Sequence, residues 1–127
     1  MPCFDDSKAT TPASVVTALR AFPSVVLIAG GKNKGLDLST LAEATDHVRA
    51  VVTIGTAAPE VAAVFEGHRP FTHATSMDQA VAQAIGAARD GDVVLLSPAC
   101  TSWDAYRDYA ERGDDFARAV KELAATR

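Results

Sequence analysis

Three short polar segments, each directly after an apolar run, hold most of the side chains that could bind or act on a ligand. They read DDSKAT (residues 5–10), GGKNKG (residues 30–35) and SPACTS (residues 97–102). The second segment places Lys32 and Lys34 on a glycine-flexible turn, which suits a small anion such as a carboxylate or a phosphate. Two solvated surface lysines would give the same pattern, so the residues alone leave both interpretations open.

The glycine-rich segment matches neither of two common nucleotide-binding loops. A Walker A loop needs Lys-Ser or Lys-Thr after its second glycine, whereas Gly35 is followed by Leu36 and Asp37. The GxGxxG spacing of dinucleotide-binding loops is also absent from this segment. We therefore predict no nucleotide-binding loop of either type here.

Cys100, in the third segment, is the obvious candidate for a nucleophile or a metal ligand. A thiolate nucleophile needs a nearby base, yet neither of the other two segments contains a histidine. Metal sites favour closely spaced ligands, but the three histidines form no i,i+4 pair, and Cys3 and Cys100 have no CxxC spacing. We predict that this chain has no catalytic residue, no metal site and two free thiols.

Around these segments the chain alternates between strand and helix patterns. Apolar runs of strand length occur in SVVLIAGG, HVRAVVTIGT and DVVLLSP, while CFDD and PFTHA suggest two shorter strands. Unbroken apolar runs are typical of parallel strands covered on both faces. The order predicts an α/β fold, a Rossmann-like three-layer open sheet that is mostly parallel, with helices on both faces. Ligands of such sheets bind beyond the carboxyl ends of the strands, where the three polar segments begin.

Helix patterns fill the intervals between the strands. TTPASVVTALRAF and APEVAAVFEG carry prolines suited to a first turn, and SMDQAVAQAIGAARDG begins with Ser76 and Gln79 at capping-box spacing. The stretch from Ser102 to the C-terminus repeats apolar residues at helical spacing, including Phe116. We expect Gly113 to break this last stretch into two helices.

Composition excludes several classes of protein. The formal net charge of −4 argues against a protein that binds nucleic acid by neutralising phosphates. No apolar stretch reaches the length of a signal sequence or of a membrane span. The 127 residues fit one domain, and we expect a cytoplasmic protein with no nucleic-acid or membrane partner.

The three polar segments, in this order, resemble the C-terminal domain of the D-glutamate-adding members of the Mur ligase family, which build peptidoglycan. The matching stretches are DDSKATTP, VVLIAGGKNKGLDLSTL and LLSPACTSWDAYRDYAERGDDF, and the resemblance covers essentially the whole chain. It implies a Rossmann-like third domain that closes over ATP and a muramoyl-alanine substrate held by two earlier domains. In this family an acyl phosphate forms, assisted by magnesium, and the amine of D-glutamate attacks it.

The resemblance also implies roles for individual residues. Thr10, Lys34 and Ser102 match positions that bind the D-glutamate carboxylates, and Tyr109 matches a contributing position that is usually phenylalanine. Nucleotide-proximal positions are matched by Asp6, at the ATP ribose, and Lys8, near the phosphates. Cys100 becomes a bystander in this interpretation.

The chain lacks the phosphate loop, the magnesium-organising residues and the nucleotide-sugar domain of the family. We therefore expect residues 1–127 to be a single D-glutamate-binding domain, a fragment of a three-domain enzyme and inactive alone. ATP and magnesium would serve the full-length enzyme, with neither bound tightly by this chain. Two alternatives stay open: a stand-alone α/β enzyme that uses Lys34, Ser102 and Cys100, and a small-anion-binding module without chemistry.

Overall fold

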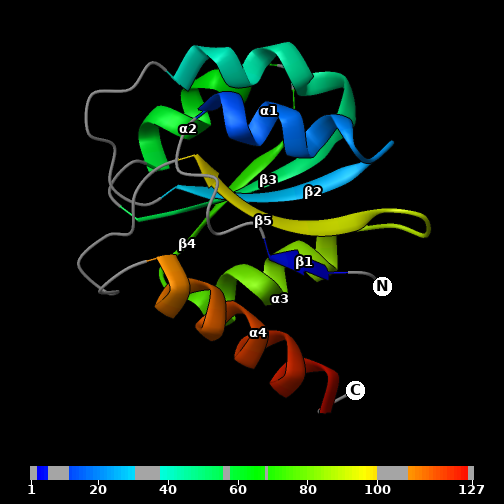
Figure 1. Cartoon of the computed structure of the whole chain (residues 1–127), viewed down its shortest axis with the longest axis vertical. Helices are drawn as coiled ribbons and strands as arrows, with labels where there is room; N and C mark the ends of the chain where they lie inside the picture. Colours follow the sequence, from blue (N-terminus) through cyan, green and yellow to red (C-terminus); the bar gives the residue numbers. More distant parts are fainter. Residues whose placement is uncertain are drawn as a thin grey trace.

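The computed structural model describes residues 3–5, 12–30, 38–55, 58–67, 69–99 and 109–125, and over these residues it is an α/β protein (Figure 1). Five strands make one sheet. Their bounds are β1 Cys3–Asp5, β2 Val25–Gly30, β3 Val48–Ile54, β4 Phe71–Ala74 and β5 Val93–Ala99. The order across the sheet is β1-β5-β2-β3-β4, and every neighbouring pair is parallel.

Helices cover both faces of this sheet (Figure 1). In chain order they are α1 Pro12–Arg20, the 3₁₀ helix η1 Leu38–His47, α2 Ala58–Phe65, α3 Met77–Ala87 and α4 Tyr109–Ala125. Helices α1, η1 and α2 lie on one face, and α3 and α4 lie on the other. The predicted three-layer architecture is confirmed.

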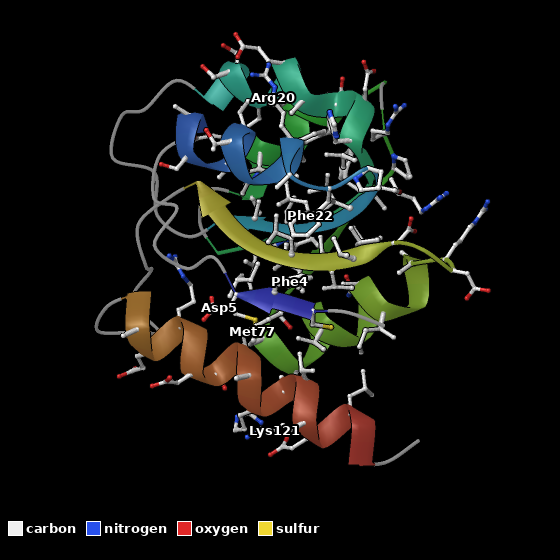
Figure 2. The ribbon with its side chains drawn as sticks, turned by 45° about the vertical axis from the view of Figure 1, so that its right-hand side comes forward. Phe4, Asp5, Arg20, Phe22, Met77 and Lys121 are labelled. Atoms are coloured by element: carbon white, nitrogen blue, oxygen red, sulfur yellow. The ribbon has the colours of Figure 1, made fainter. Side chains whose placement is uncertain are left out.

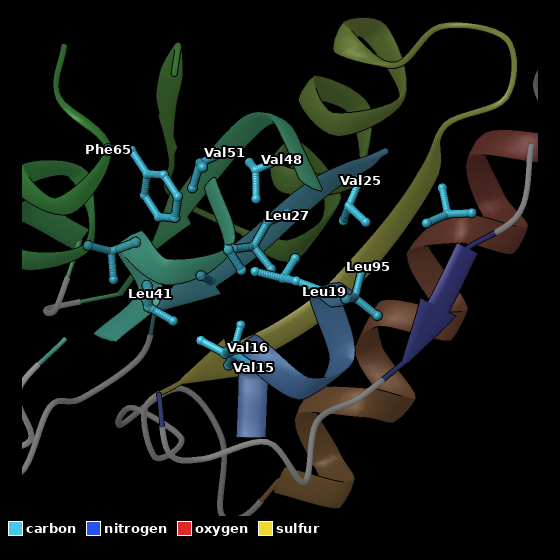
Figure 3. Close-up of a cluster of buried hydrophobic side chains, with 14 residues drawn as sticks. Val15, Val16, Leu19, Val25, Leu27, Leu41, Val48, Val51, Phe65 and Leu95 are labelled. Atoms are coloured by element: carbon cyan, nitrogen blue, oxygen red, sulfur yellow. The ribbon is translucent and has the colours of Figure 1, made fainter. Parts of the chain in front are cut away.

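Alternation along the central strand β2 explains why two separate cores form. Leu27 packs into the cluster beneath α1, η1 and α2, together with Leu19 and Phe65 (Figure 3). Its neighbours Val26 and Ile28 point to the opposite face, into the cluster beneath α3 and α4. Successive side chains of a strand point to opposite faces, so an unbroken apolar strand supplies both cores.

Helix α3 begins with the cap that the sequence predicts. The Ser76 hydroxyl accepts a hydrogen bond from the Gln79 amide at 3.1 Å. The Gln79 side chain reaches back to the amide of Thr75, at 2.8 Å, one residue earlier than in a standard capping box. Met77, Val81 and Ala84 are buried, as their spacing predicts.

Two expectations about helices were incomplete or wrong. Helix α4 runs unbroken from Tyr109 to Ala125, so Gly113 does not divide it. Gly113 is buried in the helix, where tertiary packing outweighs the roughly 1 kcal/mol that glycine costs in a helix interior. Helix η1 was not predicted, because LSTLAEATDH is only weakly apolar and is kinked at Ala44.

The short strand β1 is held at the edge of the sheet by more than its hydrogen bonds to β5. Phe4 is 44% exposed, but its ring lies 5.0 Å from that of Phe22, which follows α1 (Figure 2). This contact ties the first strand to the end of its own helix. None of the described helices is both long and apolar enough to cross a membrane.

Candidate functional site

The three polar segments singled out from the sequence leave the sheet from three adjacent strands. Strand β1 ends before residues 6–11, β5 ends before residues 100–108, and β2 ends before residues 31–37. In the sheet β5 lies between β1 and β2, although it comes last in the chain. The segments therefore start side by side at one edge.

The register of the strands gives the relative positions of the ends of β1, β5 and β2. Asp5 of β1 lies level with Leu96 of β5, which lies level with Ile28 of β2. Gly30 of β2 is paired with Ala99 of β5. Since neighbouring strands are about 4.8 Å apart, Asp5 and Ile28 are separated by about 10 Å, and β2 and β5 continue beyond that level to Gly30 and Ala99.

The structure thus brings together the segments that carry the predicted residues, not the side chains themselves. Five of those residues lie outside the described ranges, namely Asp6, Lys8, Thr10, Lys34 and Ser102. Tyr109 is the first residue of α4, where the described chain resumes after β5, and only its backbone is described. Their roles stay predictions.

Gly30 shapes the sheet just before the lysine-containing segment. Its φ of +131° lies where L side chains are rarely found, and a Cβ placed there would overlap the carbonyl oxygen of Ile54 in β3. A glycine at this position lets β2 and β3 approach closely at the carboxyl edge. The segment of residues 31–37 therefore begins from a fixed backbone position.

A buried arginine lies in the first turn of α4, and sequence reasoning missed it. Arg112 is fully buried, which is rare for a charged residue. It precedes Phe116 by four positions and so shares its face of the helix. Extending the apolar stripe back by one turn would have found it.

The same edge carries a second feature, a hollow of about 480 Å³ beside β3 and β4. Ala58, Pro59 and Ala62 of α2 form one wall, and Phe71 and His73 of β4 form part of the other.

One hydrogen-bond network in this hollow involves Thr53, Thr72 and His73. The buried Thr53 hydroxyl donates to the Thr72 carbonyl at 3.2 Å, and His73 Nδ1 lies 3.2 Å from the same hydroxyl. These two contacts join the carboxyl ends of β3 and β4.

At the opposite, amino edge of the sheet an ion pair joins β5 to β3. Arg49 donates from Nε to the carboxylate of Asp92, a side chain that is only 1% exposed. Burial alone would raise the pKa of Asp92, but hydrogen bonds from Ser24, the Arg89 amide and Arg49, with the Arg49 charge, hold that pKa below its ordinary value. This pair anchors the strands at the end remote from the polar segments.

The described residues contain no group of three or more histidine, cysteine, aspartate or glutamate side chains placed to hold a metal ion. Cys3 is a half-buried thiol, and burial raises its pKa, which disfavours the reactive thiolate. Cys100 lies outside the described residues, so its predicted role as a bystander is not tested.

The described residues form an all-parallel α/β sheet, a class of fold whose ligands commonly bind at the carboxyl edge of the strands. Residues 2–100 match the family described as Mur ligase, glutamate ligase domain, and the chain belongs to this family.

The curated relatives that match this chain belong to one kind of ligase within the family. The chain is 47% identical to the UDP-N-acetylmuramoylalanine–D-glutamate ligase of Novosphingobium aromaticivorans over 94% of its own length. It is 48% identical to the ligase of that name from Desulfosudis oleivorans, and 50% identical to the one from Frankia casuarinae. The chain spans 27%, 27% and 26% of these relatives, about a quarter of their length.

A solved structure shows the same fold. The crystal structure of the UDP-N-acetylmuramate-alanine ligase of Thermotoga maritima matches 94% of this chain and 26% of its own, with a TM-score of 0.60. Sequence identity over that match is 12%, so this likeness supports the fold alone. The fold predicted from sequence and the family resemblance are both confirmed.

Proposed function

We propose that this chain is the D-glutamate-binding domain of an ATP-dependent ligase that joins D-glutamate to UDP-N-acetylmuramoylalanine. One observation carries the proposal: β1, β5 and β2 are neighbours, so the segments that match the family's glutamate-binding motifs leave the sheet from a single edge. In open α/β sheets ligands bind at this edge. Curated relatives that are 47% and 48% identical to this chain over 94% of its length carry the corresponding name.

In the proposal the positive charge of Lys34 attracts the carboxylates of D-glutamate. Hydroxyls of Thr10 and Ser102 supply hydrogen bonds, and Tyr109, at the start of α4, completes the site. A lysine on a loop suits this role, because its ammonium group is a mobile point charge with three donors. The proposed contribution of this chain is to bind and orient the amino-acid substrate.

The other substrates belong to the rest of the enzyme in this proposal. The relatives are about three and a half times as long as this chain, and the additional length would supply the N-terminal and central domains. ATP and magnesium would be bound chiefly there, with Asp6 and Lys8 near the nucleotide when the domains close. We assign no magnesium ligand to the described residues, where no suitable acidic cluster exists. We further propose that the enzyme works in the cytoplasm.

A titration of the ¹⁵N-labelled chain with D-glutamate, followed by NMR, tests the proposal. We expect chemical-shift changes at amides of residues 30–35 and 100–104, with a dissociation constant no tighter than roughly millimolar, because few polar contacts must offset the immobilisation of a small solute. L-glutamate is the matched control and should give weaker changes. Amides in both ranges that stay unmoved at high D-glutamate concentration would contradict the proposal.

A further inference from the structure

Arg112 is the largest of the fully buried side chains in the described part of this protein. A guanidinium stays charged at any relevant pH, and moving such a charge out of water is costly unless it is paired. Arg112 does interact with other groups of the chain. Burying an apolar side chain of similar volume would cost less free energy, so we infer that the arginine does more than fill the core.

The position of Arg112 along α4 suggests that reason. Phe116 belongs to the cluster that contains Val94 and Leu96 of β5, and α4 packs against β1 and α3. Helix α4 starts on the side where the strands end and runs back across the sheet (Figure 1). Four residues earlier in the helix corresponds to about 6 Å, or about two residues of a strand, toward the carboxyl edge. Arg112 therefore lies nearer the carboxyl edge of the sheet than Phe116 does.

Arg112 therefore lies in the first turn of α4, on the side of the sheet from which the candidate segments depart. Figure 2 shows Asp5 at the tip of β1, on the side where α4 begins. Residues 6–11 follow that tip, and residues 100–108 join the end of β5 to the first turn of α4. A five-donor fork at this point can fix several backbone or carboxylate acceptors in one arrangement.

We propose that Arg112 is a positioning residue, whose buried guanidinium holds the first turn of α4 against the carboxyl ends of β1 and β5 and so orients the proposed glutamate-binding segments. The orientation of glutamate-binding segments by Arg112 rests on the proposed function. The attachment of α4 to the strand ends by Arg112 does not depend on it.

Two substitutions distinguish the effect of the planar guanidinium group from the effects of its positive charge and of its side-chain volume. Arg112→Lys keeps the positive charge but lacks the planar fork, and Arg112→Met keeps much of the volume without charge. Arg118→Met is the matched control on the same helix, since Arg118 is a surface residue whose side chain is 43% exposed and pairs with Asp78, Asp115 and Glu122.

Hydrogen exchange followed by NMR, without ligand, is the first measurement. We expect amides of residues 95–97, 99 and 112–114 to lose protection at least tenfold in both Arg112 variants, while amides of α3 keep theirs. The Arg118 variant should keep protection at residues 95–99. If the Arg112→Lys variant kept wild-type protection at the carboxyl edge, the proposal would be overturned. This variant alone is sufficient for the test if Arg112→Met fails to fold.

The second measurement is the D-glutamate titration of Arg112→Lys, with the melting temperature recorded for the same sample. We expect the shift changes at a fixed D-glutamate concentration to fall at least fivefold while the protein remains folded. A purely structural role would lower the melting temperature without this loss, and an unchanged response would overturn the positioning role. If the wild-type chain itself does not respond to D-glutamate, the proposed function fails, and hydrogen exchange still decides whether Arg112 fixes the edge.

Discussion

At the scale of single residues, the proposed glutamate site depends most on one positive charge. Replacing Lys34 with alanine should abolish D-glutamate binding by the chain, because it removes the cation that attracts the carboxylates. The melting temperature should stay within about 2 °C of the wild type, since a loop lysine leaves no core cavity when it is truncated.

The NMR titration and a thermal melt check this prediction together. Cys100→Ala serves as the control from a neighbouring segment and should bind D-glutamate as the wild type does. Loss of binding in the cysteine variant, or unfolding of the lysine variant, would show that the two residues have been assigned the wrong roles.

A second residue prediction concerns Asp92, whose pKa is lower in the folded chain than in the unfolded one, where aspartate titrates near 3.9. A lowered folded-state pKa gives stability that is fully present above the unfolded-state pKa and is lost as pH falls through the folded-state value. Asp92→Asn should therefore lower the free energy of unfolding by about 2 kcal/mol at pH 7, and the difference should shrink below about pH 4.

Urea denaturation at several pH values measures this difference. The exposed neighbour Asp90 provides the control, and Asp90→Asn should change the free energy of unfolding by less than about 0.5 kcal/mol. A difference for Asp92→Asn that is the same at pH 3 and at pH 7 would mean that the ionised carboxylate contributes nothing.

At the scale of elements, the apolar runs predicted the strands because β2, β3 and β5 are covered on both faces and need no polar side chains. The order of the strands in the sheet could not be predicted from the sequence. Strand β5 enters between β1 and β2 by a long crossover, and no local pattern records where such a crossover ends. The adjacency of the three polar segments is therefore a result of the structure.

Helix α4 shows how local propensity can mislead. The glycine at position 113 suggested a break, yet the burial of Phe116, Ala119 and Arg112 along one face keeps the helix continuous. Arg112 itself was missed because only apolar residues were used to define the buried face of this helix. Its place on the apolar stripe was the better indicator.

The approach of β2 to β3 at Gly30 gives a prediction at this scale. Gly30→Ala should destabilise the domain by at least about 3 kcal/mol, because the new Cβ overlaps a backbone carbonyl and the positive φ disfavours any L side chain. Gly86→Ala, in helix α3 with open space around the added methyl group, should instead stabilise by up to about 1 kcal/mol. Chemical denaturation of both variants checks the pair, and equal stability of the two would contradict the argument.

At the scale of the whole molecule, the chain alone should neither hydrolyse ATP nor form an amide bond. Phosphoryl transfer needs backbone amides and a lysine around the phosphates, with magnesium between them. GGKNKG lacks the required Lys-Ser or Lys-Thr. Phosphate release from ATP, magnesium, UDP-N-acetylmuramoylalanine and D-glutamate should equal that of a buffer control. Release that depends on every substrate and is lost in Lys34→Ala would favour a stand-alone enzyme.

The most direct test of the central claim replaces the C-terminal quarter of a relative with this chain. The ligase of Novosphingobium aromaticivorans is suitable, since the two share 47% of residues over 94% of this chain. The measurement is the rate of phosphate release by the chimera as D-glutamate is increased. We predict a rate that rises and saturates with D-glutamate and that falls at least 100-fold in the Lys34→Ala chimera. A chimera that melts cooperatively, yet releases no more phosphate with D-glutamate than without it, would contradict the assignment of this chain as a D-glutamate-binding domain.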